Sequence, residues 1–111
     1  MAKFVIEKHD MGRGIWQMTA YEPNWPAPIG IAWVLGFSGP KKDGAVLFDC
    51  YTSVGYRRQG VMTQIVGAIL RDYEYVSSDG VSKDGTAFMR KTGFKYRRES
   101  GDWIRTRGKT T

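Results

Sequence analysis

The sequence is poor in the residues that would build a disulfide framework or a zinc site. It contains one cysteine, Cys50, and one histidine, His9. A single cysteine cannot form an internal disulfide, and a cysteine plus a histidine are too few for a zinc site, which is usually four-coordinate. We therefore expect a protein of a reducing compartment, without a metal.

The sequence also lacks a long apolar run. No segment approaches the roughly 18 consecutive apolar residues that indicate a membrane-spanning helix. The first ten residues, MAKFVIEKHD, acquire charge too early for a secretory signal peptide. We expect a cytoplasmic protein that does not bind a membrane.

Acidic residues are outnumbered. The chain has 17 Lys and Arg against 11 Asp and Glu, and its net charge is +6. Such a charge suits a nucleic acid, an acidic protein or a phosphorylated cofactor, and it does not choose among them. The 111 residues, 41% hydrophobic and without repeat or linker, are expected to form a single globular domain over residues 1–111.

The pattern of apolar residues predicts an α+β fold. Helices are predicted at residues 60–75, from apolar residues spaced by four, and at 84–92, from N-cap candidates and the closing Gly93. Strands are predicted at residues 4–8, 15–21, 29–37 and 45–52 and in a closing hairpin of 94–98 and 103–107, with 75–78 as a candidate for a further short strand. The result is a mixed, mostly antiparallel sheet of about six strands with two main helices.

The predicted strand at 45–52 is apolar on both faces, apart from Asp49. This pattern is typical of a central strand that is covered on both sides. Cys50 is accordingly expected to be a small buried core residue.

A phosphate-binding turn is predicted where this strand leads into the first helix, at Tyr56 to Thr63 (YRRQGVMT). A Gly-containing turn before a helix directs free backbone N–H groups to one point, and the helix dipole adds partial positive charge there. Such a turn can hold a phosphate, and Arg57 and Arg58 add full charges. The alternative is an ordinary strand-to-helix turn with exposed arginines.

Two motifs resemble those of the GNAT superfamily, the acyl-CoA-dependent N-acyltransferases. The spacing Arg57-x-x-Gly60-x-Met62 resembles its pyrophosphate signature, Arg/Gln-x-x-Gly-x-Gly/Ala, with Met62 in the last position. The segment Gly85–Phe94 (GTAFMRKTGF) resembles its second motif, a short helix that ends in Gly-Phe. The resemblance spans roughly residues 45–94, and the strand order extends it more weakly to both ends.

The resemblance implies acetyl-CoA as a co-substrate and assigns residues to it. The backbone around Cys50, Thr52 and Val54 would pair with the pantetheine amides. The pyrophosphate would lie on the amides of Arg58, Gln59, Gly60, Val61, Met62 and Thr63, with Arg57 close by. Ser82 would contact the CoA arm, and Phe88 and Met89 would line the cleft where the fourth and fifth strands splay apart.

The implied reaction moves an acetyl group from acetyl-CoA to a primary amine, so the site must position the reactants and remove the ammonium proton. Asp49 is the best-placed base by sequence, ahead of Asp79 and Glu22, although a buried structural Asp is an equal alternative. Met89 stands where the superfamily often has a tyrosine that protonates the leaving thiolate. Tyr51, Tyr96 or solvent would have to take that role.

The acceptor side is expected to be open. The superfamily usually has two helices between its first two strands, whereas only His9–Gly14 separates them in this chain. The acceptor would then be a protein lysine or N-terminus, or a partner subunit such as a second copy would complete the site. Compact phage versions of the superfamily look similar, and for a phage protein the compartment would be the host cytoplasm.

Two other functions stay open. The chain could bind CoA without catalysis and act as an interaction module, a reading that Met89 favours. It could also be a small basic nucleic-acid-binding protein, although no RNP, KH or zinc-finger pattern is present. A basic strip for that purpose would combine Tyr96 and Trp103 with the cations Arg97, Arg98, Arg105, Arg107 and Lys109.

Overall fold

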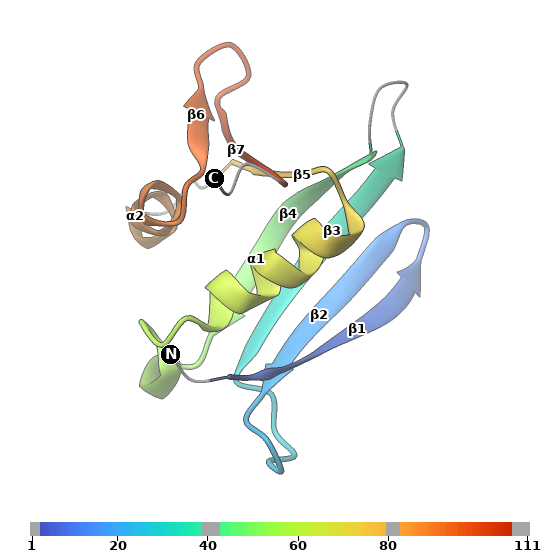
Figure 1. Cartoon of the computed structure of the whole chain (residues 1–111), viewed down its shortest axis with the longest axis vertical. Helices are drawn as coiled ribbons and strands as arrows, with labels where there is room; N and C mark the ends of the chain where they lie inside the picture. Colours follow the sequence, from blue (N-terminus) through green and yellow to red (C-terminus); the bar gives the residue numbers. More distant parts are fainter. Residues whose placement is uncertain (1–2, 39–42, 80–82, 108–111) are drawn as a thin grey trace.

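A computed structural model of the chain describes residues 3–38, 43–79 and 83–107. Its elements are β1 (Val5–Gly12), β2 (Ile15–Tyr21), β3 (Gly30–Ser38), β4 (Asp43–Thr52), the 3-10 helix η1 (Val54–Tyr56), α1 (Val61–Asp72), β5 (Tyr75–Ser78), α2 (Lys83–Lys91), β6 (Lys95–Arg97) and β7 (Asp102–Thr106). This confirms the predicted α+β class, with seven described strands rather than about six (Figure 1).

The strands form one sheet in the order β1-β2-β3-β4-β5-β7-β6. Every neighbouring pair is antiparallel except β4 and β5, which run parallel. The first four strands thus form an antiparallel meander. β1 and β2 are joined at Arg13 and Gly14, whose φ angles of 56° and 78° are those of a tight two-residue hairpin loop.

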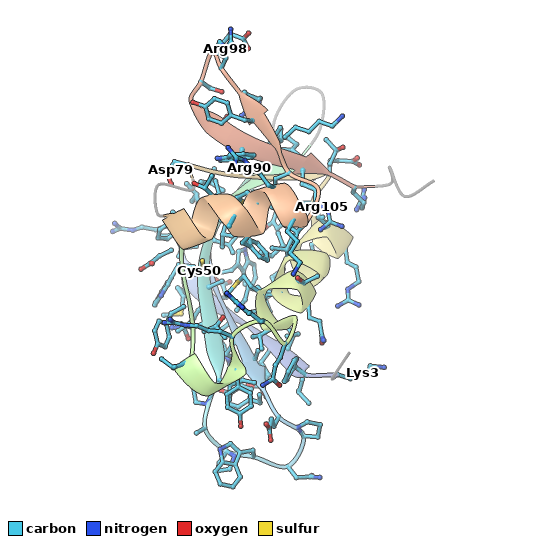
Figure 2. All side chains as sticks on the ribbon, turned by 90° about the vertical axis from the view of Figure 1, so that its left-hand side faces the viewer. Lys3, Cys50, Asp79, Arg90, Arg98 and Arg105 are labelled. Atoms are coloured by element: carbon cyan, nitrogen blue, oxygen red, sulfur yellow. The ribbon has the colours of Figure 1, made fainter. Side chains whose placement is uncertain are left out.

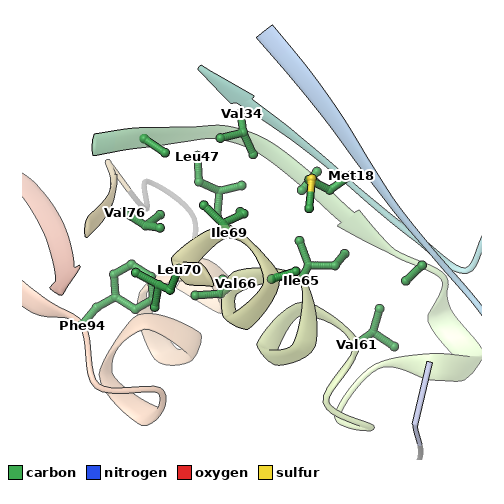
Figure 3. Close-up of a cluster of buried hydrophobic side chains, with 14 of the residues drawn as sticks. Met18, Val34, Leu47, Val61, Ile65, Val66, Ile69, Leu70, Val76 and Phe94 are labelled. Carbon is green, nitrogen blue, oxygen red and sulfur yellow. The ribbon is translucent and has the colours of Figure 1, made fainter. Parts of the chain in front are cut away.

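Helix α1 packs its apolar side against one face of the sheet. Val61, Ile65 and Ile69 recur every fourth residue and are at most 2% exposed, and Figure 3 shows them facing the sheet residues Met18 and Leu47. The helix is shorter than predicted: it ends at Asp72, because Tyr73 adopts an extended backbone with φ −127° and ψ 151°.

Helix α2 ends as the sequence predicts. Gly93 has a φ of +89°, and the amide of Phe94 donates to the carbonyl of Met89 at 3.0 Å, which is the long hydrogen bond of a Schellman motif. Phe94 is 4% exposed, so this ending also ties the end of α2 to the core.

The second half of β4 contradicts the prediction of a strand that is covered on both sides. Phe48 is inserted as a β-bulge opposite Trp33 and Val34, and from Phe48 to Tyr51 every residue is exposed. Phe48 is 50% and Tyr51 55% exposed, and β5 pairs with β4 only as far as Val46. The strand is central in its first half and open in its second.

The opposite face of the β1–β4 sheet carries no described helix; we call it the open face. Figure 1 shows α1 crossing one face of β1–β4, while α2 stands beside β6. Strand register places Glu7, Thr19, Ile31 and Tyr51 side by side in one row of the open face. None of the described helices has the length and apolarity that crossing a bilayer requires.

Candidate functional site

The parallel pair β4 and β5 forms a fork. Three residue pairs join the strands, from Gly44–Tyr75 to Val46–Ser77, and β5 then ends at Ser78 whereas β4 continues to Thr52. Among the described residues no strand pairs with the β5 side of β4 beyond Val46. The N–H and C=O groups on that edge are thus available to a ligand that pairs like a strand.

The free end of β4 leads directly to the start of α1. Gly60 occupies the N-cap with a left-handed φ of 83°, a conformation that glycine adopts without strain, and it provides no side-chain cap. The amides of Val61, Met62 and Thr63 have no acceptor within the helix, and no acidic residue lies in its first turn. The N-terminus of α1 is therefore an uncapped, electropositive point beside the fork.

Two arginines flank this helix start. The Nε of Arg57 donates to the carbonyl of Thr52 at 3.2 Å, and its guanidinium lies 6.0 Å from the ring centroid of Tyr51. Arg58 is exposed and has a φ of 67°, which is unusual for a non-glycine residue. Neither arginine takes part in an ion pair among the described residues, so both charges can attract an anion.

Asp49 and Tyr51 share the open face at the free half of β4. They pair with Trp33 and Ile31 of β3, and both are exposed. The alternative of a buried structural Asp49 is therefore wrong. Because the two side chains occupy alternate positions of one strand, they can contact the same small group.

Tyr96 does not lie near Asp49 and Tyr51. Its strand, β6, is separated from β4 by β5 and β7, so about 14 Å of sheet lies between the two at ordinary strand spacing. Its ring packs on Trp103 with a centroid distance of 5.3 Å, and its hydroxyl lies close to Gly101 in the β6–β7 turn. The prediction of Tyr96 as a catalytic acid is thus wrong, and Tyr51 is the candidate that remains near Asp49.

Cys50 is exposed, so its predicted place in the core is wrong as well. In Figure 2 it lies on β4 beneath α2. Although the side chain reaches solvent, the surrounding protein still desolvates it and raises the pKa of its thiol, and the neighbouring Asp49 carboxylate raises that pKa further. Both effects disfavour the thiolate, which argues against Cys50 as a nucleophile.

The residues predicted around the second motif differ in their burial. Met89 is 3% exposed in the core, so the prediction that it lines the cleft is wrong. Phe88 is half-buried, with its ring 6.4 Å from that of Phe94. Ser82 lies outside the described residues, and Asp79 is exposed just after β5.

Sequence reasoning missed Tyr56, which joins the turn to the loop after β2. Its hydroxyl donates a hydrogen bond to Glu22, and this bond is the main reason why the pKa of Tyr56 is raised. No local sequence pattern links Tyr56 to a carboxylate so far away along the chain.

The predicted basic strip is partly neutralised. Arg97 makes two hydrogen bonds to the Asp102 carboxylate, at 2.8 and 2.6 Å, and lowers the pKa of that acid. Arg107 pairs with Glu74 at 2.7 Å, and Lys109 lies outside the described residues. Of the strip's cations, Arg98 and Arg105 thus form no ion pair within the described part of the chain (Figure 2).

Solved structures show what this arrangement is similar to. The KacTA–DNA complex matches with a TM-score of 0.68 and 13% identity over 86% of this chain and 69% of its own. AtaT complexed with acetyl-methionyl-tRNAfMet matches with a TM-score of 0.66 and 11% identity, over 85% and 72%. The chain has the GNAT acetyltransferase fold.

A third match to the GNAT fold is an aminoglycoside acetyltransferase from an uncultured soil metagenomic sample, in complex with sisomicin. Its TM-score is 0.60 and its identity 19%, over 74% of this chain and 59% of its own. No protein-family model matches the chain, and no curated protein sequence matches it significantly. At these identities the GNAT fold is shared, while the chemistry must be argued from the fork and the helix start.

Proposed function

We propose that the chain is a GNAT-superfamily N-acetyltransferase, acting as one domain over residues 1–111, that moves the acetyl group of acetyl-CoA to a primary amine. One observation carries this proposal: the unpaired edge of β4 ends beside the uncapped N-terminus of α1. A strand-like arm with a pyrophosphate at its end fits an edge that leads to an anion-binding helix start. The structures of AtaTR and AtaT with acetyl-CoA support the choice of cofactor.

In this proposal the backbone around Cys50 and Thr52 pairs with the amides of the pantetheine arm. The predicted pairing of Val54 is not retained, because Val54 lies in the 3-10 helix η1 rather than in β4. The pyrophosphate lies on the amides of residues 58–63, where Arg57 and Arg58 add charge. Because backbone groups make most of these contacts, Met62 in the last position of the motif leaves the donors intact. Phe88, half-buried, remains a candidate wall of the fork.

The chemistry takes place on the open face. The amine nitrogen attacks the thioester carbonyl carbon, the carbon–sulfur bond breaks, and the thiolate of CoA leaves. Asp49 accepts the proton that the ammonium group must lose, directly or through water, and Tyr51 or solvent protonates the thiolate. Since no described helix covers this face, the acceptor amine can belong to a protein lysine or N-terminus.

A second candidate is a module that binds CoA without turnover. The observation that favours it is Met89, which is buried at 3% and cannot act as the tyrosine that the superfamily often uses. Cofactor binding with no acetyl transfer to any amine would select this candidate.

The first test is the thermal stability of the protein with and without acetyl-CoA. A ligand that binds only the folded chain stabilises it by about 2.7 kcal/mol at 100 times its dissociation constant. Gly60→Asp places a carboxylate at the proposed pyrophosphate, so we expect it to abolish the ligand-induced shift. Gly67→Asp is the matched control, because Gly67 is an exposed position of the same helix with open space around it.

The ligand-induced shift, rather than the absolute melting temperature, is the quantity to compare. Gly60→Asp also introduces a side chain at a positive φ, which lowers stability by about 1 kcal/mol whether or not a ligand binds there. An equal ligand-induced shift in both variants would mean that the start of α1 does not bind the cofactor. No shift in the unmodified protein would overturn the proposed function.

A further inference from the structure

A hollow on the open face has no role in the proposed cofactor site. It lies where β1 begins and β2 ends and measures about 510 Å³. Its walls are Val5, Glu7, Tyr21, Glu22, Asn24, Trp25 and Pro26. The register pairs Val5 with Tyr21 and places Glu7 two residues further along the same face, so the sheet itself forms the floor.

The walls combine carboxylates with aromatic rings. The charged residues that line the hollow, Glu7 and Glu22, are both acidic, although the chain carries a net charge of +6. Trp25 is 57% exposed, which leaves much of a large aromatic side chain in solvent. An anion would be repelled from this hollow, and a neutral apolar ligand would gain nothing from its two carboxylates.

An alkylammonium group can bind both the carboxylates and the aromatic rings of the hollow. Its charge pairs with the carboxylates, and its cationic head binds the ring faces of Trp25 and Tyr21 by cation–π contact. Glu22 is held in place by the hydrogen bond that it accepts from Tyr56, and Glu7 has the Nε2 of His9 at 3.5 Å. These contacts orient the carboxylates at the edges of the hollow before any ligand arrives.

The hollow lies at a defined distance from the fork. Glu7, Thr19, Ile31 and Tyr51 are in register across β1, β2, β3 and β4, so three strand spacings, about 14 Å, separate Glu7 from Tyr51. We infer that the hollow binds one alkylammonium group of a polycationic acceptor while a second amine of the same molecule reaches Asp49 and Tyr51. This inference rests on the proposed function for the second amine, but not for binding in the hollow.

Binding is tested without acetyl-CoA, by titrating the protein with spermine and following the indole N–H signals in NMR spectra. The signal that Trp25→Phe removes is the one expected to shift. Losing one cation–π contact at an exposed site weakens binding about two- to fivefold, so Trp25→Ala should raise the dissociation constant by that factor. The double variant Glu7→Gln Glu22→Gln should raise it about tenfold, as two exposed charge pairs are lost.

The double variant Asp43→Asn Glu99→Gln is the matched control, because it also removes two carboxylate charges, both from exposed positions away from the hollow. Its dissociation constant should equal that of the unmodified protein. A loss as large as that of Glu7→Gln Glu22→Gln would mean that spermine responds only to net charge, which would overturn the inference. An unshifted Trp25 signal would overturn it too.

The link to the fork is tested with peptides that carry two lysines. Lysines four residues apart span about 13 Å in an extended chain. Acetyl transfer to such a peptide should show a KM several-fold lower than transfer to one with glutamine in place of the second lysine, and Glu7→Gln Glu22→Gln should erase that difference. Equal KM values in the unmodified protein would overturn the polycationic acceptor. Spermine binding without any acetyl transfer would keep the hollow as a cation site and reject the proposed function instead.

Discussion

Cys50 offers a direct probe of the fork, because it is the one cysteine of the chain and is exposed on the half of β4 that lacks a partner strand. The perturbation is alkylation of its thiol by N-ethylmaleimide, followed by the mass of the intact protein. If acetyl-CoA lies along this edge, the bound cofactor should cover the thiol. Labelling should then slow by a factor of 1 + [L]/Kd, which is about elevenfold at ten times the dissociation constant.

The pH dependence of the labelling gives a second, independent magnitude. Only the thiolate reacts, and the pKa of Cys50 is raised above its ordinary value of 9.0 by desolvation and by Asp49. The labelling rate of the free protein should therefore rise about tenfold per pH unit from pH 7 and still be rising at pH 9. Asp49→Asn removes one of the two causes, so it should lower the pKa and speed labelling at pH 7.

The control separates occupancy from indirect effects. Gly60→Asp should label at the same rate with and without acetyl-CoA, whereas Gly67→Asp should be protected like the unmodified protein. Full labelling at a cofactor concentration that raises the melting temperature would refute the reasoning, because acetyl-CoA would then be bound away from β4.

The remaining predictions concern catalysis and the core. Asp49→Asn should lower kcat about 10²-fold, because it deletes the proposed base; release of CoA measures the rate, and an unchanged kcat would contradict the assignment. The same variant should keep its unfolding free energy, since Asp49 is exposed. Leu47→Ala should cost about 2–5 kcal/mol in urea unfolding, because Leu47 is 1% exposed beneath α1. Phe48→Ala, one residue on and 50% exposed, should cost clearly less, and equal losses would contradict the bulge.

The sequence predicted the elements well where a local pattern determines them. The spacing of Val61, Ile65 and Ile69 indicated the buried side of α1, and Gly93 indicated the end of α2, because helix periodicity and glycine caps depend on nearby residues. The strand–turn–helix around Gly60 was predicted for the same reason.

Prediction from the sequence failed where the burial of a side chain depends on residues that are distant along the chain. The apolar pattern of β4 indicated burial on both faces, but burial also needs a neighbour, and β5 is too short to cover the strand beyond Val46. Neither the short pairing with β5 nor the bulge at Phe48 can be recognised from the sequence of β4 alone. Cys50 was predicted to be buried and is exposed, whereas Met89 was predicted to line the cleft and is buried. Residue type predicts a preference for burial, whereas strand pairing and helix packing determine the burial itself.

The closed end of the fork explains why the other end can stay open. Tyr75 lies so close over Gly44 that a Cβ there would collide with its ring, and Tyr73 lies in the same way over Gly36. The sheet register assigns Gly44 and Gly36 to opposite faces, so the two tyrosines hold the segment after α1 against β3 and β4 from both sides.

Three parallel residue pairs would be a weak junction without this packing, and the aromatic contacts let the pairing stop at Val46 without loss of the fold. Gly36 and Gly44 thus support the proposed site although they do not line it. They let the two tyrosines pack closely at the closed end of the fork, where β5 begins to pair with β4.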